Sequence, residues 1–91
     1  MTKATNVEIY TILGCPYCQK AKALLDQLKI PYEERDLTTH PDRRAFTSKI
    51  LPGHTSVPLI LIHQKPIGGF SELKELHAKG QLESMVFGEE S

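Results

Sequence analysis

The stretch that decides the fold is Val7-Glu8-Ile9-Tyr10-Thr11-Ile12-Leu13-Gly14-Cys15-Pro16-Tyr17-Cys18. Its first six residues alternate in character and are rich in β-branched and aromatic side chains, a pattern typical of a β-strand. Gly14 and Pro16 interrupt the pattern, and proline suits the first position of a helix, where a missing N–H costs nothing. The sequence therefore predicts a strand, a short loop that carries two cysteines, and a helix.

The segment that follows predicts a helix over Tyr17–Lys29, which Pro31 ends. Apolar residues recur there at the i, i+3, i+4, i+7 spacing of one helix face: Ala21, Leu24, Leu25 and Leu28. A second, short strand is predicted over Pro31–Asp36. A strand–helix–strand unit implies a parallel pair of strands joined by a right-handed crossover.

The middle of the chain predicts a helix over His40–Leu51 and then a buried strand over Pro58–His63, the most apolar run. Ala45, Phe46, Lys49 and Ile50 recur along that helix at helical spacing. Gln64–Lys65 is expected to form a hairpin turn into a brief strand, Pro66–Ile67. This hairpin adds an antiparallel pair to the parallel pair.

The last predicted helix is Ser71–Lys79, with Leu73 and Leu76 facing inward and Gly80 beyond its end. Beyond it we expect one more packed turn, made by Leu82, Met85, Val86 and Phe87, and a frayed end over Glu89–Ser91. The element order predicts an α/β fold, a four-stranded mixed sheet flanked by three or more helices. Residues 1–91 are expected to form one domain.

The composition excludes several classes of function. Eleven basic residues balance eleven acidic ones, so we expect no binding to nucleic acid or to an anionic membrane. No apolar run approaches the roughly 20 residues that a membrane-spanning helix needs. The first six residues are polar and lack the apolar region of a secretory signal, so a cytoplasmic location is expected.

The two cysteines, Cys15 and Cys18, are the only ones in the chain. A disulfide across so short a loop would restrict the unfolded chain little, so a structural staple is a poor explanation. A structural zinc site needs four ligands, and this pair supplies two; we expect no metal site. The pair is well placed for reversible oxidation.

The predicted helix start assigns a role to each thiol. Unpaired N–H groups and a partial positive charge at a helix N-terminus favour the thiolate of Cys15 at the cap position. The thiolate is the attacking species in disulfide exchange. Cys18 follows about one turn later and is expected to be less exposed. Cys15 is therefore the predicted nucleophile and Cys18 the predicted resolving thiol.

Two further motifs lie where a predicted strand and a predicted helix begin. Pro58, after Thr55-Ser56-Val57, either merely opens a strand or forms a cis bond that leaves the Val57 backbone free for an extended ligand; the residues alone favour trans. Ser71 stands at the start of the last helix, a ready site for a carboxylate. Its hydroxyl can contact such a ligand or cap the helix, and both can hold at once.

The motifs Cys15-Pro16-Tyr17-Cys18, Ser56-Val57-Pro58 and Gly68-Gly69-Phe70-Ser71 resemble the glutaredoxin family in order and spacing. The resemblance implies a thioredoxin fold, a cis Pro58, and glutathione as co-substrate, with no permanently bound cofactor. It implies a glutathione-binding surface made of Tyr17, Ser56, Val57, Pro58, Gly69, Phe70 and Ser71. Partners would be glutathione and disulfide-containing or glutathionylated proteins, and the protein is expected to be a monomer.

The sequence departs from its relatives at one charged position. Glutaredoxins usually carry a lysine three residues before the first cysteine, where it meets the glycyl carboxylate of glutathione; here Ile12 occupies that position. A second polar contact aligns with Ala45, although Arg43, Arg44 and Lys49 are close by. A lost charge-assisted contact costs about 1.5–3 kcal/mol.

Three functions follow from the resemblance. The first is a glutathione-dependent thiol–disulfide oxidoreductase that reduces protein disulfides and glutathione mixed disulfides. The second is an electron donor to ribonucleotide reductase that is itself reduced by thioredoxin reductase. Gly69-Phe70 resembles the corresponding motif of such glutaredoxin-like donors. The third is a module that binds a [2Fe–2S] cluster. Pro16 argues against the third, because proline stiffens the loop that a cluster must approach, and monothiol relatives that bind clusters usually have CGFS.

Overall fold

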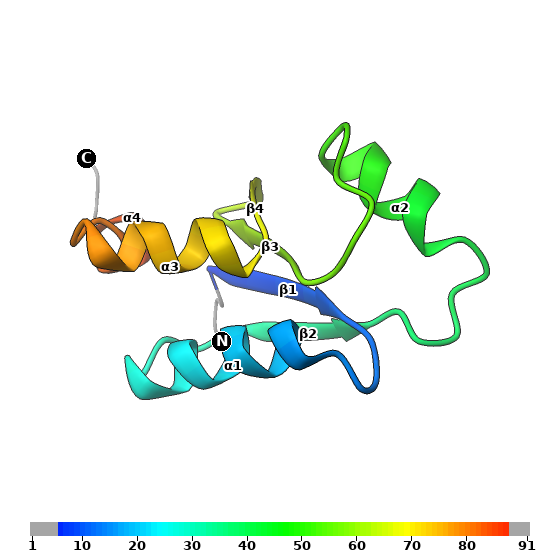
Figure 1. Cartoon of the computed structure of the whole chain (residues 1–91). Helices are drawn as coiled ribbons and strands as arrows, with labels where there is room; N and C mark the ends of the chain where they lie inside the picture. Colours follow the sequence, from blue (N-terminus) through cyan, green and yellow to red (C-terminus); the bar gives the residue numbers. More distant parts are fainter. Residues whose placement is uncertain (1–5, 88–91) are drawn as a thin grey trace, which may run out of the picture.

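The computed structural model describes residues 6–87, arranged as a mixed sheet with helices packed against it (Figure 1). Within these residues, every helix is too short or too polar to cross a bilayer. The predicted frayed end, Glu89–Ser91, lies outside them. The elements are β1 (Val7–Thr11), α1 (Pro16–Gln27), β2 (Glu33–Asp36), α2 (Arg43–Ile50), β3 (Leu59–Ile62), β4 (Lys65–Gly68), α3 (Phe70–Ala78) and α4 (Leu82–Phe87).

The sheet has the strand order β2-β1-β3-β4. β1 pairs in parallel with β2 and antiparallel with β3, and β3 pairs antiparallel with β4. The predicted parallel pair, the predicted hairpin and the mixed four-stranded α/β sheet are thus confirmed. The register places Tyr10 opposite Leu59 and Ile60 opposite Gly68. The end of β1, the start of β3 and the end of β4 therefore lie at the same end of the sheet.

One face of the sheet carries the core. Val7, Ile9 and Thr11 alternate inward along β1, and Ile9 lies opposite Ile60 of β3. Helices α1 and α3 cover this face. They contribute Ala21, Leu25 and Leu73 to the same buried cluster, as the helical spacing predicts. Burying these side chains supplies most of the driving force for folding.

Helix α2 lies on the opposite side of β1 from α1 (Figure 1), where its Phe46 ring packs edge-on against Tyr10 with the centroids 5.3 Å apart. Of the four residues at helical spacing, Ala45 and Lys49 are exposed and Phe46 and Ile50 are half-buried; the buried residue is Thr47. The helix begins later than predicted because the Asp42 carboxylate caps it, accepting from the Ala45 amide at 3.2 Å.

The hairpin and the last helix also differ from prediction. The turn is formed by His63 and Gln64, both with positive φ (52° and 69°), and Lys65 is already in β4. Two-residue turns of this handedness match strand twist but usually contain Asn or Gly, so the sequence offered no signal. In α4, Leu82 and Val86 are buried at helical spacing, whereas Met85 and Phe87 are exposed, contrary to the packed set predicted.

Leu25→Ala tests the importance of the α1 face in the core. Leu25 is fully buried, so its truncation leaves a cavity and is expected to cost about 2–5 kcal/mol of unfolding free energy in urea titrations. Leu13→Ala is the matched control, since Leu13 is 81% exposed, and should cost less than about 0.5 kcal/mol. Equal losses in the two variants would contradict this packing.

Candidate active site

Cys15 is the N-cap residue of α1, and Pro16 follows at the first helical position, as predicted. The Cys18 amide donates a hydrogen bond to the Cys15 sulfur at 3.1 Å. A backbone donor aimed at sulfur from a helix N-terminus stabilises negative charge there. The sequence folds this way because a cysteine before proline takes the extended backbone that a cap requires, with ψ at 112°.

Cys18 is the more deeply placed thiol, with 1% of its surface exposed against 7% for Cys15. Burial raises the pKa of Cys18 to about 12, and a hydrogen bond with the Cys15 sulfur also raises it. The backbone of Ile12 and the charge of Lys22 act in the opposite direction. Cys18 is therefore a neutral thiol near pH 7, in contact with Cys15 and screened from solvent.

The segment before β3 forms the wall beside Cys15. The Val57–Pro58 peptide bond is cis, as the family resemblance implies and contrary to the trans form that the residues alone favour. The Cys15 sulfur lies 3.9 Å from the Val57 carbonyl oxygen. The backbone of Val57 is thus close enough to meet a ligand attached to Cys15.

The start of α3 forms the opposite wall. Gly69 caps the helix, and its amide donates to the Glu72 carboxylate at 2.8 Å. A Cβ at Gly69 would lie 3.2 Å from the Pro58 carbonyl oxygen, so glycine permits this close approach. Ser71 lies inside the first turn and is exposed; the alternative that it caps the helix is therefore wrong.

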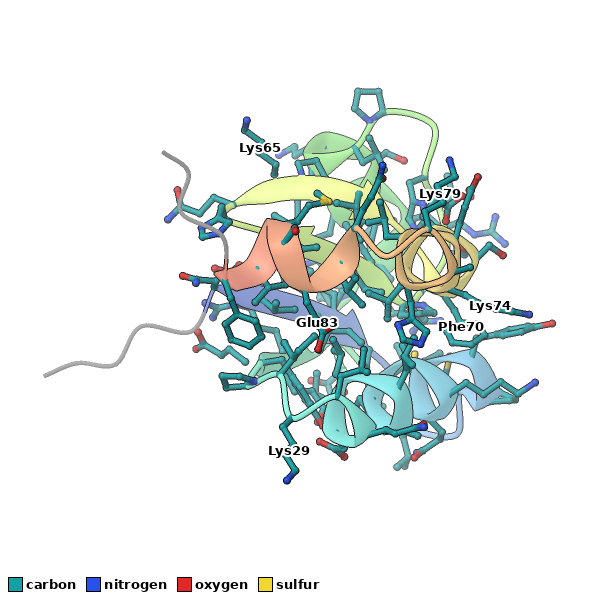
Figure 2. The ribbon with its side chains drawn as sticks, turned by 90° about the vertical axis from the view of Figure 1, so that its left-hand side faces the viewer. Lys29, Lys65, Phe70, Lys74, Lys79 and Glu83 are labelled. Atoms are coloured by element: carbon teal, nitrogen blue, oxygen red, sulfur yellow. The ribbon has the colours of Figure 1, made fainter. Side chains whose placement is uncertain are left out.

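The two walls enclose a cavity of about 190 Å³. Phe70 lies between α3 and α1 (Figure 2), with its ring 6.2 Å from that of Tyr17. All seven residues predicted to bind glutathione line this cavity: Tyr17, Ser56, Val57, Pro58, Gly69, Phe70 and Ser71. His54 and Glu72 line it as well.

His54 is the lining residue that the sequence did not predict. Its Nε2 lies 3.3 Å from the Pro58 carbonyl oxygen, so the ring packs against the start of β3. No motif in the sequence indicated this position. Its place depends on the loop that brings residues 51–57 back to the sheet, and no local pattern reports that.

A second cavity, of about 370 Å³, adjoins the first and shares Ser56 and Val57 with it. Cys15 and Ile12 both line this cavity, so the apolar Ile12 side chain lies where a lysine-bearing relative has its cation. Arg43 and Arg44 of α2 line it, whereas Ala45 and Lys49 do not. Their two guanidinium groups are the cations among the lining residues that could pair with an anion bound beside Cys15.

The arrangement supplies the parts that thiol–disulfide exchange needs: a capped sulfur, a second thiol in contact with it, and a groove on both sides. Within residues 6–87, no three His, Cys, Asp or Glu side chains gather as a metal site would require. Both cysteines are in the free thiol state. The geometry is thus that of a dithiol centre.

Comparison with known proteins agrees with this geometry. The family model for glutaredoxin matches residues 7–67. Glutaredoxin 1 of Rickettsia bellii is 40% identical over 84 residues, covering 89% of this chain and 86% of the relative. Glutaredoxin 3 of Escherichia coli K12 is 40% identical over 81 residues, covering 89% and 96%.

Solved structures agree in fold. The crystal structure of a buckwheat glutaredoxin–glutathione complex superposes with a TM-score of 0.81 at 30% identity, covering 89% of this chain and 76% of that one. The cis Pro58 is a feature that the resemblance led us to expect, and the cap at Cys15 is one that the residues themselves predicted. The chain belongs to the glutaredoxin family, thiol–disulfide oxidoreductases of the thioredoxin fold.

Proposed function

We propose that this protein is a glutathione-dependent oxidoreductase that reduces protein disulfides and glutathione mixed disulfides through Cys15 and Cys18. The observation that carries the proposal is the cavity in which Tyr17, Val57 and Ser71 meet next to the capped thiol. The function suits a reducing cytoplasm, and it requires no permanently bound cofactor.

The reaction begins at Cys15. Its thiolate attacks one sulfur of the substrate disulfide, a mixed disulfide forms, and the other sulfur leaves as a thiolate. Either glutathione or Cys18 then attacks the mixed disulfide. When Cys18 attacks, the product is an intramolecular disulfide, which two molecules of glutathione reduce while they are oxidised to glutathione disulfide.

The first cavity suits the γ-glutamyl end of glutathione. A carboxylate at the start of α3 would meet free backbone N–H groups at Phe70 and Ser71, the positive end of the helix. The Val57 backbone would pair with the cysteinyl part of the peptide, and the rings of Tyr17 and Phe70 would flank it. The similarity to a glutaredoxin whose structure holds glutathione supports this placement.

The second cavity suits the glycyl end. Its carboxylate would find no cation at Ile12, so Arg43 and Arg44 are left to pair with it from α2. Both arginines are exposed, and long exposed side chains gain little from pairing in solvent. We therefore expect weaker glutathione affinity than in a lysine-bearing glutaredoxin, with the α3 contacts carrying most of the binding.

An NADPH-coupled assay identifies the reductant. With hydroxyethyl disulfide as substrate, we expect NADPH oxidation with glutathione plus glutathione reductase, because the seven residues that the resemblance assigns to glutathione line the first cavity. Thioredoxin reductase in place of that pair should give little turnover. Turnover with thioredoxin reductase alone would instead favour the electron-donor function, and each coupling enzyme is checked with its own known substrate.

Substitution of each cysteine tests their roles. Cys15→Ser is expected to abolish both activities, since it removes the attacking sulfur. Cys18→Ser should keep deglutathionylation, which needs one thiol, and lose most reduction of a protein disulfide. The two reactions are followed with a glutathionylated peptide and with an insulin-type disulfide substrate. Identical behaviour of the two variants in both reactions would contradict the assignment.

The Ile12 position tests the glycyl site. Ile12→Lys is expected to lower KM for a glutathione mixed disulfide by about two- to fivefold, the range of an exposed ion pair, and added salt should erode the gain. Replacing Arg43 and Arg44 together by alanine should raise KM by a similar factor. Lys49→Ala is the control, because Lys49 lies outside both cavities. An unchanged KM in Ile12→Lys would show that the carboxylate already has a good partner.

A further inference from the structure

A short chain of polar side chains lies next to the cysteine pair, between α1 and the sheet. The Lys22 ammonium contacts the Glu34 carboxylate of β2 at 2.9 Å. The hydroxyl of Thr11, a buried residue of β1, donates to the same carboxylate oxygen at 2.7 Å. Because Thr11 is fixed in the core, Glu34 is held in place, and Glu34 in turn holds Lys22.

Lys22 lies four residues after Cys18 in α1, on the same side of the helix. Side chains at this spacing have Cβ atoms about 5–6 Å apart. The Lys22 side chain is 21% exposed, so its charge is only partly screened by solvent. Burial has the largest influence on the pKa of Cys18 and raises it, whereas the charge of Lys22 lowers it.

Lys22 is the charged side chain that lowers the pKa of Cys18. The contact with Glu34 raises the pKa of Lys22, which keeps it a cation, and the contact with Lys22 lowers the pKa of Glu34. The other titratable groups that face the cluster are acidic: Cys15 and Asp26 on α1, Tyr32 before β2, and Asp36 on β2. None of them stabilises a thiolate at Cys18.

We propose that Lys22, held by Glu34 and Thr11, stabilises the Cys18 thiolate and so sets the rate at which Cys18 resolves a mixed disulfide on Cys15. A buried anion is costly unless a cation compensates it. Lys22 is a positioning residue in this scheme, because it acts through Cys18 and does not contact the substrate. The inference rests on the dithiol cycle proposed above.

The step exchanges one disulfide for another. The Cys18 thiol loses its proton to a solvent base, and its sulfur forms a bond to the Cys15 sulfur. The bond between Cys15 and the substrate sulfur breaks with its electron pair, and the substrate leaves as a thiolate that takes up a proton. No external oxidant or reductant takes part, since the electrons stay within the exchanging sulfurs.

A stopped-flow reaction with 5,5′-dithiobis(2-nitrobenzoate) separates the two thiols. Attack by Cys15 releases the first coloured thiolate, and resolution by Cys18 releases the second. In Lys22→Met we expect the second phase to slow by about tenfold at pH 7, the effect of a tenfold smaller thiolate fraction. Its pH profile should move to higher pH while the first phase keeps its rate. Lys22→Arg should restore most of the second phase.

The control is Lys79→Met. It removes the cation of a surface ion pair at the end of α3, in which the Lys79 ammonium lies 3.3 Å from the Glu75 carboxylate. This variant should change neither phase. An unaltered second phase and pH profile in Lys22→Met would overturn the inference. Equal slowing by Arg and Met, together with lower stability in urea, would also overturn it, since Lys22 would then be only structural. A single phase in the parent chain would instead refute the dithiol cycle, and the inference with it.

Discussion

The hydrogen bond from the Cys18 amide to the Cys15 sulfur, 3.1 Å long, joins the chemistry of this protein to its fold. It satisfies a backbone donor that the first turn of α1 would otherwise leave unpaired, and it holds the sulfur at the positive end of the helix. The same helix turns Cys18 inward with Ala21 and Leu25, the residues that pack α1 on the sheet. Cys15 at the cap thus keeps more of its surface exposed than Cys18 one turn later, 7% against 1%, for one geometrical reason.

Sheet topology assembles the rest of the site. β1 and β3 are antiparallel neighbours, so the chain leaves β1 at the end of the sheet where it enters β3. β4 is antiparallel to β3 and ends there as well. The cysteine loop, the Val57–Pro58 segment and the start of α3 therefore meet, although some fifty residues separate the first from the last. The close contact of Gly69 with Pro58 completes the cavity, and β2, parallel to β1, brings Glu34 to Lys22.

Sequence patterns predicted what depends on near neighbours along the chain. Alternation in β1, the apolar spacing in α1 and the proline after Cys15 each report local geometry, and all were right. The patterns failed at the start of α2, which the cap at Asp42 sets and which apolar spacing does not report. They failed again at the His63–Gln64 turn, which adopts positive φ without glycine, and at Met85 and Phe87, which are exposed.

By itself the sequence determined the strand–loop–helix unit, the cysteine pair at a helix start, and the family resemblance that named the lining residues. Only the tertiary structure decided that His54 joins the first cavity, that Arg43 and Arg44 rather than Lys49 line the second, and that Glu34 and Thr11 hold Lys22 next to Cys18. The physical reason is the distance along the chain over which each signal acts. Helix and turn signals act over about four residues, whereas these contacts depend on strand register and on loops that no local pattern encodes.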